Sequence, residues 1–512
     1  MSCVLAITGR SVRVGGRFAQ TVAMNFYCLI SGICLFLPLT VSATARYVDL
    51  NNPSAASPFT SWATAATNIQ DAVDAAIAGD EIIVTNGVYA SGGRAIHGTM
   101  TNRVAVDKPL RLRSVNGPQS TVIEGYQVPS ATNGDGAVRC VYLTNGASLS
   151  GFTIANGATR SAGDSSQTCG GGVWSESHAT TLTNCIVVGN SAYNRGGGTF
   201  SGTLASCAIL SNSIPQPYWW GYGGGAYSTI LSNCTLRGNF AWYGGGATAS
   251  SLTKCVLTGN WAWDAGGGAF ACALENCLVI GNLANGGGGT FLGTLNNSLI
   301  VSNSANFAGG TVSGTLNNCT ITGNSAYDTI GGAYCGLLNN SIVQHNSAPT
   351  EPDYLFDGEF PGLMNYCCVT PLPSTGVGNI TNAPLFLDIA ETDLRLSPNS
   401  PCINAGTNYY STGPSDLDGN PRIVGSTVDM GAYEYQFAQP SLRITPAGTN
   451  ILLAWPPWAS DFELQQTLVF PPSPVDWSNV SSVPVIINGE NTVTLPLTTE
   501  PSLFRLSKPP QP

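Results

Sequence analysis

Charged residues are scarce in this chain of 512 residues, of which 9 % are Asp, Glu, Lys or Arg, against about 25 % in an average soluble domain. Glycine is plentiful at 61 residues. Amphipathic helices need charged side chains on their solvent face, and each interior Gly costs a helix about 1 kcal/mol. The composition therefore excludes a mainly helical protein, and the hydrophobic share of 43 % excludes a disordered one.

Basic residues are scarcer than acidic ones, with 19 Lys and Arg against 29 Asp and Glu, which gives a net charge of −10. Nucleic acid and anionic lipid both require a basic patch, so we expect neither as a partner. Histidine is nearly absent, with 3 residues. Because the Cys and His spacing of a zinc site is also missing, we expect no metal centre of that kind.

The first 45 residues are typical of a secretory signal peptide. Three arginines precede an apolar run at 26–41, and small residues follow it at 41–45. The run of about sixteen residues is short for a membrane span, and no later segment is long and apolar enough to be one. We expect an exported chain whose mature part begins near Arg46, with a retained N-terminal anchor as the alternative.

A repeat of 21 or 22 residues organises the middle of the chain. It is marked by an asparagine that recurs with one longer step of 27 residues, at Asn190, Asn212, Asn239, Asn260, Asn282, Asn303, Asn324 and Asn346. Five residues before each stands a Cys or Ser, namely Cys185, Cys207, Cys234, Cys255, Cys277, Ser298, Cys319 and Ser341. A Gly-Gly pair and a Leu keep the same register, so the segments form one repeat family.

Each repeat contains short extended pieces separated by Asn and Gly corners, such as 319–322. Three short strands per coil, each stacked on its equivalent in the next coil about 4.8 Å away, form a parallel β-helix. Stacked repeats would place identical charges on top of one another, which explains why charged residues are few. A leucine-rich repeat has a similar period, but its consensus leucines and its helix-forming half are missing.

Residues 46–130 are expected to begin this β-helix. A capping-box pattern at 67–70 predicts a short helix ending near Gly79, with Ile69, Val73, Ala76 and Ile77 on one face, as a lid over the first coil. The segments 78–89, 108–113 and 120–125 resemble the opening of the right-handed parallel β-helix proteins of the pectin-lyase-like superfamily. The resemblance covers 46 to about 437 and implies the fold. It leaves function open, because that superfamily holds lyases, hydrolases and adhesins.

Two later segments carry weaker resemblances. The motifs at 400–406, 416–422 and 429–435 are similar to the closing segment of bacterial surface β-helices that carry varied anchoring tails, the choice-of-anchor type. Residues 441–508 resemble a small fibronectin-like or immunoglobulin-like β-sandwich. We therefore predict an all-β protein with five parts, namely a signal peptide (1–45), a cap with the first coils (46–130), the repeats (131–384), the closing segment (385–437) and the sandwich (441–508).

Thirteen cysteines remain after the signal peptide, so at least one thiol is free or intermolecular. Serine replaces cysteine at 298 and 341, which indicates that the position needs only a small side chain. We expect stacked, buried thiols, with scattered disulfides as the alternative.

Aromatic residues gather between the repeated Asn and the next Gly-Gly pair. The repeat register predicts that they line one edge of the stack as an aromatic strip, made of Tyr193, Tyr218, Trp219, Trp220, Trp242, Tyr243, Trp261 and Trp263. Flat rings on a rigid surface suit the apolar faces of sugars, so the strip is a candidate glycan-binding site. The alternative is that the rings pack on one another. A second aromatic series after the Gly-Gly pairs, Phe200, Tyr227, Phe270, Phe291 and Tyr334, is expected to be structural.

Candidate catalytic groups are few. A lyase or hydrolase needs grouped carboxylates and a proton acceptor, and the least unlikely participants are Arg237, Lys254, Asp264 and Glu275. Asp416 and Asp418 look like part of a Ca²⁺ loop, with a plain Asp-Gly turn as the alternative.

The sequence therefore favours an exported, non-catalytic, adhesin-like scaffold that binds a polysaccharide or another surface molecule. The alternative is a carbohydrate-active enzyme, foremost a polysaccharide lyase.

Overall fold

The computed structural model describes residues 43–215, 220–356, 362–436, 440–460, 462–467, 477–498 and 501–507. Its contacts divide the chain into residues 1–42 and residues 43–512. The first unit lies outside the described residues, so the signal peptide at 1–45, of which only residues 43–45 are described, stays a prediction. Within the described ranges, no helix is both long and apolar enough to cross a bilayer.

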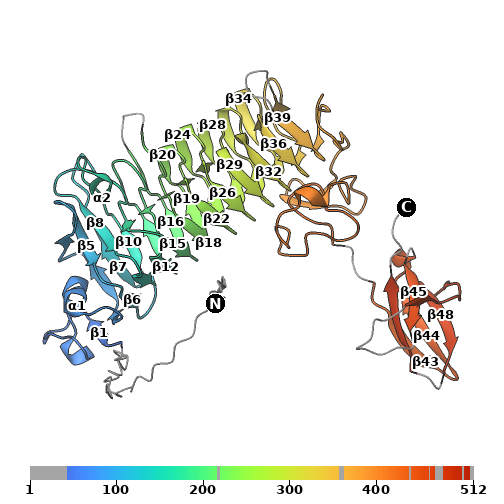
Figure 1. Ribbon diagram of the computed structural model, residues 1–512, viewed down its shortest axis with the longest axis horizontal. Coiled ribbons are helices and arrows are strands. Elements are labelled where there is room, and N and C mark those ends of the chain that lie inside the picture. The colour runs from blue at the N-terminus through green and yellow to red at the C-terminus, as the bar shows by residue number, and fades with distance from the viewer. Residues whose placement is uncertain are drawn as a thin grey trace, which may run out of the picture. The chain divides into compact units, whose positions relative to one another are not determined.

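Parallel strands stacked coil upon coil confirm the expected parallel β-helix (Figure 1). The largest sheet contains β1 (Ala45–Val48), β2 (Glu81–Val84), β4 (Arg94–Ala95), β5 (Thr101–Val106), β6 (Arg111–Ser114), β8 (Val138–Leu143), β9 (Ser148–Ser150), β11 (Val173–Ser175), β12 (Thr181–Thr183), β14 (Thr199–Phe200), β15 (Thr203–Ala205), β17 (Ala226–Tyr227), β18 (Ile230–Ser232), β21 (Ala247–Thr248), β22 (Ser251–Thr253), β25 (Ala269–Phe270), β26 (Ala273–Glu275), β29 (Thr290–Asn296), β32 (Thr311–Asn317), β35 (Ala333–Tyr334), β36 (Gly336–Asn339), β38 (Tyr354–Leu355) and β39 (Gly362–Asn365). All of these pairings are parallel except that of β4 with β5.

Two further sheets complete the coils. One contains β3 (Gly87–Tyr89), β7 (Thr121–Glu124), β10 (Thr153–Ala155), β13 (Ile186–Val188), β16 (Ala208–Leu210), β19 (Thr235–Arg237), β23 (Val256–Thr258), β27 (Leu278–Ile280), β30 (Leu299–Val301), β33 (Thr320–Thr322), β37 (Ile342–Val343) and β40 (Cys368–Val369). The other contains β20 (Phe240–Tyr243), β24 (Trp261–Ala265), β28 (Leu283–Gly286), β31 (Ser304–Phe307) and β34 (Ser325–Thr329). The coil that begins at β17 has four short strands. In the coils of β29 and β32 the first two merge, which leaves the expected three.

The repeated asparagines form a continuous buried ladder of side-chain hydrogen bonds. Asn239 Nδ2 donates to Asn260 Oδ1 over 2.9 Å, and Asn260 Nδ2 donates to Asn282 Oδ1 over 2.9 Å. The backbone N–H of each ladder Asn also donates to the next Oδ1, as Asn239 does to Asn260 over 3.0 Å. The ladder ends at Asp353, whose Oδ1 accepts from Asn346 Nδ2 over 3.0 Å. Every polar atom of these buried amides thus has a partner one coil away, which sets the register.

The Gly-Gly pairs lie where the next coil approaches closely. A Cβ on Gly225 would lie 2.5 Å from the carbonyl oxygen of Gly246 and 3.0 Å from Asn239 Cγ. No real side chain tolerates such distances, so glycine at this corner allows both the coil spacing and the ladder.

The cysteine positions confirm the expectation of stacked, buried thiols. All thirteen described cysteines are free and buried. Backbone N–H groups donate along the stack, from Cys234 to Cys255 Sγ over 3.4 Å and from Cys277 to Ser298 Oγ over 3.0 Å. Serine therefore substitutes for cysteine as a small acceptor, as the sequence indicated.

Helix α1 (Ile69–Ala75) covers the first coil, but it begins one residue later than the capping-box pattern at 67–70 indicates and ends earlier than expected. Asn68 is its N-cap and accepts from the Asp71 N–H over 2.9 Å. Ile69 and Val73 are buried as predicted, whereas Ile77 is 51 % exposed because the helix has ended before it. The expected helix end near Gly79 and the placement of Ile77 on its buried face were therefore wrong.

The first coil already includes residues before the expected mature start at Arg46. Thr44 N–H donates to Asp80 Oδ1 over 2.9 Å, and Ala45 pairs with Glu81. Arg46 forms a buried ion pair with Asp80 over 2.9 Å. A signal peptide ending at Ala43 would keep these contacts, whereas removal of residues 44 and 45 would break them.

The closing segment packs on the outer side of the coils. It contains β41 (Phe386–Asp388), β42 (Asp393–Leu396) and a 3₁₀ turn at Asn408–Tyr410. Leu394 and Ala432 form a buried apolar cluster with Leu299 and Val301 of β30. The outward residues of β30 are apolar because this segment covers them.

The C-terminal module has two antiparallel sheets, as expected for a sandwich. One contains β43 (Arg443–Ala447), β44 (Asn450–Trp455), β48 (Glu490–Pro496) and β47 (Val485–Ile487), and the other β46 (Ser478–Asn479), β45 (Glu463–Thr467) and β49 (Leu503–Ser507). Trp455 and Val493 of the first sheet share a core with Leu464 and Leu506 of the second.

Replacing a ladder asparagine should destabilise the coils strongly. In Asn260→Ala the N–H and Nδ2 of Asn239 lose their acceptor, and the Leu236 carbonyl oxygen and Asn282 Oδ1 lose the Asn260 Nδ2 donor. Each unsatisfied buried group costs about 1–3 kcal/mol, so we expect a loss of about 3 kcal/mol or more in urea unfolding. The matched control is Asn306→Ala, which removes an exposed amide pair with Asn285 and should change stability by less than about 0.5 kcal/mol. Equal effects of the two substitutions would contradict the role of the ladder.

Candidate functional site

The outward face of the five-stranded sheet carries the largest exposed part of the expected aromatic strip. Phe240 of β20 lies opposite Trp261 of β24, and Trp261 lies opposite Leu283 of β28. A second column lies beside the first, three residues after each ladder Asn, and contains Trp242, Trp263, Asn285, Asn306 and Tyr327. We call Phe240, Trp242, Trp261 and Trp263, with the adjoining Leu283, Asn285 and Asn306, the aromatic face.

The four rings of the aromatic face contact one another, and two of them stay exposed. The Phe240 and Trp261 centroids are 4.6 Å apart, and those of Trp242 and Trp263 are 5.7 Å apart. Trp261 is 41 % exposed and Trp263 is 55 % exposed. Ring packing, the alternative considered from the sequence, therefore occurs, and it leaves Trp261 and Trp263 exposed while Phe240 and Trp242 are half-buried.

A shallow hollow of about 490 Å³ lies over the aromatic face. It is lined by Trp242, Trp261, Trp263, Asp264, Leu283, Ala284, Asn285 and Asn306. Asn306 Nδ2 donates to Asn285 Oδ1 over 2.9 Å, which leaves further amide groups of this pair free to meet a ligand. Among these lining residues Asp264 alone is ionisable. The hollow thus offers apolar ring faces, amide donors and acceptors, and one carboxylate.

The structure divides the predicted strip. Tyr218 and Trp219 lie outside the described residues. Tyr193 is half-buried in the coil of Asn190 and does not belong to the five-stranded sheet. Trp220 is 70 % exposed and lines a different cavity, beside Arg195.

Tyr243 also leaves the strip. Its ring lies against the Gly-Gly corner, where it stacks on Tyr222 at 5.0 Å and meets Phe270 at 5.2 Å. Burial, and then the hydrogen bond and charge of Asp264, raise the pKa of Tyr243 to about 12. Tyr243 therefore lies at the corner with Tyr222 and Phe270 and not among the exposed rings of the aromatic face.

Sequence reasoning missed Leu283, Asn285, Asn306 and Tyr327 as members of this surface. The signal that could have found them is the offset from the ladder. Residues one and three positions after each ladder Asn point outward from the five-stranded sheet, whatever their type. A search restricted to aromatic residues could not show that the rings continue into amides.

The four candidate catalytic residues do not form one group, although Lys254 and Glu275 are neighbours, since the Lys254 N–H donates to the Glu275 carbonyl oxygen over 2.9 Å. Arg237 ends β19, and Lys254 occupies the next corner with φ +53°, the position held by Asn in neighbouring coils. Glu275 accepts from Asn297 Nδ2 over 2.9 Å at that corner, whereas Asp264 lies in β24 on the aromatic face. No ion pair joins any two of them in the described ranges. A hydrolase needs two carboxyl groups across one bond, and this arrangement does not provide them.

The two calcium candidates are engaged by protein groups. Asp416 is buried, and its oxygens accept from the N–H groups of Asn420 over 2.8 Å and Glu434 over 3.0 Å. Asp418 forms an ion pair with Arg395 over 2.7 Å. These contacts form an Asp-Gly turn, and a cation would have to displace them. No group of three or more metal-ligating side chains occurs among the described residues.

Asp416 belongs to a cluster of buried charged residues that lies within the closing segment. Asp429, Glu434 and Arg422 are each less than 5 % exposed, and Arg422 Nη2 donates to the carbonyl oxygens of Asp429 and Gly431. Burial raises the pKa of Asp429 to about 6 and that of Glu434 to about 8. Arg422 opposes both shifts as the nearby cation.

No family model matches the sequence, and no curated protein is significantly similar to it. Among solved structures, the chain is similar to pectate lyase Pel9A, with 15 % identity over 78 % of this chain and 98 % of that one and a TM-score of 0.40. It is also similar to XylC in complex with xylose, with 9 % identity over 88 % of this chain and 100 % of that one and a TM-score of 0.34. A rhamnogalacturonan lyase is similar with 12 % identity over 68 % of this chain and 92 % of that one and a TM-score of 0.31. Such values assign no activity. The chain is a parallel β-helix protein with an exposed aromatic face.

The buried charge cluster predicts a pH-dependent effect of Arg422→Met. Both raised carboxyl pKa values lie above their unfolded values of 3.8 and 4.5, so their contribution to stability falls as the pH rises from about 4 to about 8. In Arg422→Met the ionised carboxylates lose their neighbouring cation. The variant should therefore be less stable than the parent protein by about 3 kcal/mol at pH 8 and by less at pH 5. Hydrogen exchange of the backbone amides in residues 393–436 measures this difference in stability at each pH. Arg395→Met, which removes an exposed ion pair, is the control, and an equal loss at both pH values would be evidence against the cluster.

Proposed function

We propose that this protein is an exported, non-catalytic β-helix that binds a glycan through the aromatic face. The observation that carries the proposal is the pair of exposed rings, Trp261 and Trp263, beside the half-buried Phe240 and Trp242 and the amides of Asn285 and Asn306. Aromatic rings contact the apolar faces of sugars, and side-chain amides bind hydroxyl groups. The chemistry of the face therefore suits an uncharged stretch of polysaccharide.

The geometry of the coils supports an extended ligand. Successive strands are about 4.8 Å apart, so the outward side chains form a regular row parallel to the stacking direction. The row passes from Trp261 through Leu283 to Ser304 along one column. Because the ladder fixes the spacing, little side-chain or backbone ordering is needed on binding, which lowers the entropic cost.

The enzyme alternative has less support. Asp264 has no second carboxylate in the hollow to share acid and base roles, and Arg237, Lys254 and Glu275 lie at other corners of the coils. A binding surface needs none of these groups. The adhesin-like role is therefore the better interpretation of the face, with a polysaccharide or a glycosylated surface molecule as its partner.

Export is part of the proposal. The apolar run at 26–41 ends in Val41-Ser42-Ala43, which has the small residues of a cleavage site. Cleavage after Ala43 would leave Thr44 as the first residue, with its new ammonium group beside the buried Asp80 carboxylate. A cell-surface or extracellular location, with the closing segment or the C-terminal module in an anchoring role, follows from the same interpretation.

Substitution of the exposed tryptophans tests the aromatic face. Affinity electrophoresis of residues 44–512 should show retention by a neutral polysaccharide in a panel of xylan, mannan, galactan and β-glucan. In Trp261→Ala/Trp263→Ala the affinity should fall at least tenfold, because exposed aromatic anchors carry most of such binding energy. Trp62→Ala is the matched control, since Trp62 is 44 % exposed in a different part of the chain.

The outcomes separate the two functions. Equal retention of the double variant and the parent protein would remove the aromatic face from consideration. Release of unsaturated products or reducing ends from any polymer, abolished in Asp264→Asn, would contradict the non-catalytic proposal and favour the enzyme.

A further inference from the structure

Two strands of the five-stranded sheet carry one residue more than the strand beside them. The pairing register shifts by one residue between β24 and β28, and again between β31 and β34. At each shift the longer strand has an exposed aromatic residue followed by an aspartate, namely Trp263 and Asp264 in β24 and Tyr327 and Asp328 in β34. Bulges of this kind re-aim side chains and are frequent beside functional sites. The sheet thus presents the same pair of chemical groups, a ring and a carboxylate, at two places.

The two pairs belong to one column that follows the stacking direction. β24, β28, β31 and β34 are consecutive strands of the sheet, so Trp263 and Tyr327 are three strand spacings apart, or about 14 Å. Asn285 of β28 and Asn306 of β31 lie opposite each other between them, joined by their hydrogen bond of 2.9 Å. The column therefore leads from a ring over two amides to a second ring.

The side chains of this column are accessible. Tyr327 is 81 % exposed, more than either tryptophan of the aromatic face, and Asn285, Asn306 and Asp328 are exposed as well. A ring that buries so little surface contributes little to the stability of the coils. Tyr327 can therefore contact a ligand with most of its ring.

The column carries negative charge only. β24, β28, β31 and β34 contain no Lys, Arg or His, whereas Asp264 and Asp328 place one carboxylate at each end of the column. Asp264 is hydrogen-bonded to Tyr243, but a carboxylate has about four acceptor sites, so both aspartates can accept from sugar hydroxyl groups. A chain of uronate or sulfated sugars would meet like charges at both ends. The column thus selects an uncharged ligand.

The length of the strands sets the direction of the ligand. Each of the four strands has 4 or 5 residues, and alternate side chains point outward. A polymer lying along one strand would therefore leave the sheet after two or three outward side chains. A polymer lying along the column meets a further outward side chain at every strand spacing of about 4.8 Å.

A straight column also favours an extended ligand. Glucan, mannan and xylan with β-1,4 linkages form ribbons in which each sugar is about as long as one strand spacing, about 4.8 Å. About four such sugars reach from Trp263 to Tyr327. Glucan with α-1,4 linkages coils instead, so it would leave the column after one or two sugars.

We propose that the aromatic face binds four consecutive sugars of an unbranched, uncharged β-1,4-linked polysaccharide, which lies along the stacking direction. The outer sugars stack on Trp263 and Tyr327, and the inner ones donate to and accept from the amides of Asn285 and Asn306. This proposal rests on the glycan-binding function proposed above and adds the class, the direction and the length of the bound chain.

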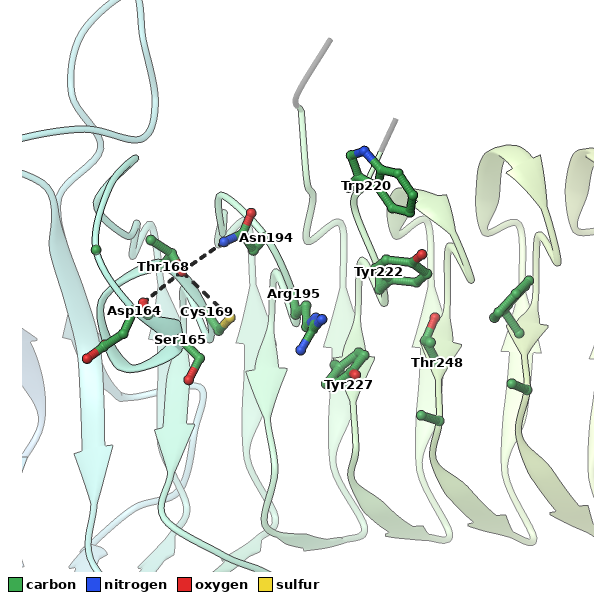
Figure 2. A pocket seen from close by; sticks show the side chains of 14 residues that line it. Asp164, Ser165, Thr168, Cys169, Asn194, Arg195, Trp220, Tyr222, Tyr227 and Thr248 are labelled. Atoms are coloured by element: carbon green, nitrogen blue, oxygen red, sulfur yellow. Dashed lines mark hydrogen bonds between the residues drawn. The ribbon is translucent and has the colours of Figure 1, made fainter. Parts of the chain in front are cut away.

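Another surface with aromatic rings has to be kept apart from this one in any binding experiment. It is the cavity of about 630 Å³ at the Gly-Gly corners (Figure 2), whose lining includes Trp220, Tyr222, Tyr227, Arg195 and Asp164. Trp220 is 70 % exposed there. The variant Trp220→Ala therefore shows whether a sugar binds in that cavity instead.

The length of the oligosaccharide tests the proposal. Isothermal titration calorimetry on residues 44–512 uses cello-, manno- and xylo-oligosaccharides of two, four and six sugars, with maltohexaose and hexagalacturonate as comparisons. At least one of the three series should bind, and its affinity should rise at least tenfold from two to four sugars but less than threefold from four to six. Maltohexaose and hexagalacturonate should bind at least tenfold more weakly than the hexasaccharide of that series.

Substitutions at the far end of the column give a second measurement. Tyr327→Ala should lower the affinity for the tetrasaccharide at least fivefold and leave that for the disaccharide unchanged, because the disaccharide is held at the tryptophans. Asp328→Ala should weaken tetrasaccharide binding in the same way. Tyr409→Ala is the matched control, since Tyr409 is 84 % exposed in the closing segment, and it should change neither affinity.

The outcomes distinguish this proposal from the function on which it rests. Binding that depends on Trp261 and Trp263 but not on Tyr327 or on chain length would keep the aromatic face as a glycan site and overturn the proposed chain. Retention of a polysaccharide without binding of any of the three series would do the same, as would equal binding of either comparison. Unchanged binding in Trp261→Ala/Trp263→Ala, or its loss in Trp220→Ala, would overturn both.

Discussion

Buried hydrogen bonds between asparagine side chains hold each coil in register with the next, and the other features of the coils depend on them. An amide in this position can accept from one coil and donate to the following one, so an unbroken row leaves no buried polar atom unpaired. The row needs the backbones to approach closely at the Gly-Gly corner, which excludes side chains there. It also stacks every other position on its own equivalent. Small, uncharged and aromatic residues gain from such stacking, whereas repeated charges repel, and this accounts for the unusual composition.

The same constraint produces two different aromatic surfaces. Rings one and three residues after each ladder Asn point away from the five-stranded sheet and form an accessible face. Rings beside the Gly-Gly corner stack along the coils and are half-covered by one another. Within the second set, the arrangement of rings is redundant, because either of two positions in a coil can supply the ring that covers the corner. Tyr243 and Phe307 show this redundancy, because each packs against a ring of the next coil, Tyr243 on Phe270 and Phe307 on Tyr334.

Periodic features were predictable from the sequence, and features made by single contacts were not. The ladder, the stacked thiols and the parallel coils repeat many times, so the repeat spacing alone defines their register. Tyr243 directly precedes Gly244, a positive-φ glycine that recurs at Gly223 and Gly266, so its corner is periodic, and residue type alone did not distinguish it from the outward rings. The covering of Leu299 and Val301 by Leu394 and Ala432, from a distant part of the sequence, leaves no periodic trace. Ile77 was misplaced because a helix face was extended past the point where the chain leaves the helix.

Each coil is a unit defined by one step of the ladder, so removal of one complete unit tests this claim most directly. Deletion of residues 282–302 would place Asn303 on Asn260 and Ser304 beside Trp261, with every other register kept. Far-ultraviolet circular dichroism and urea unfolding of this variant should show a folded β-protein with one cooperative transition and slightly lower stability. Deletion of residues 282–291, which breaks the register, should unfold the coils. Loss of structure in the first variant, or its retention in the second, would contradict the claim that the ladder sets the fold.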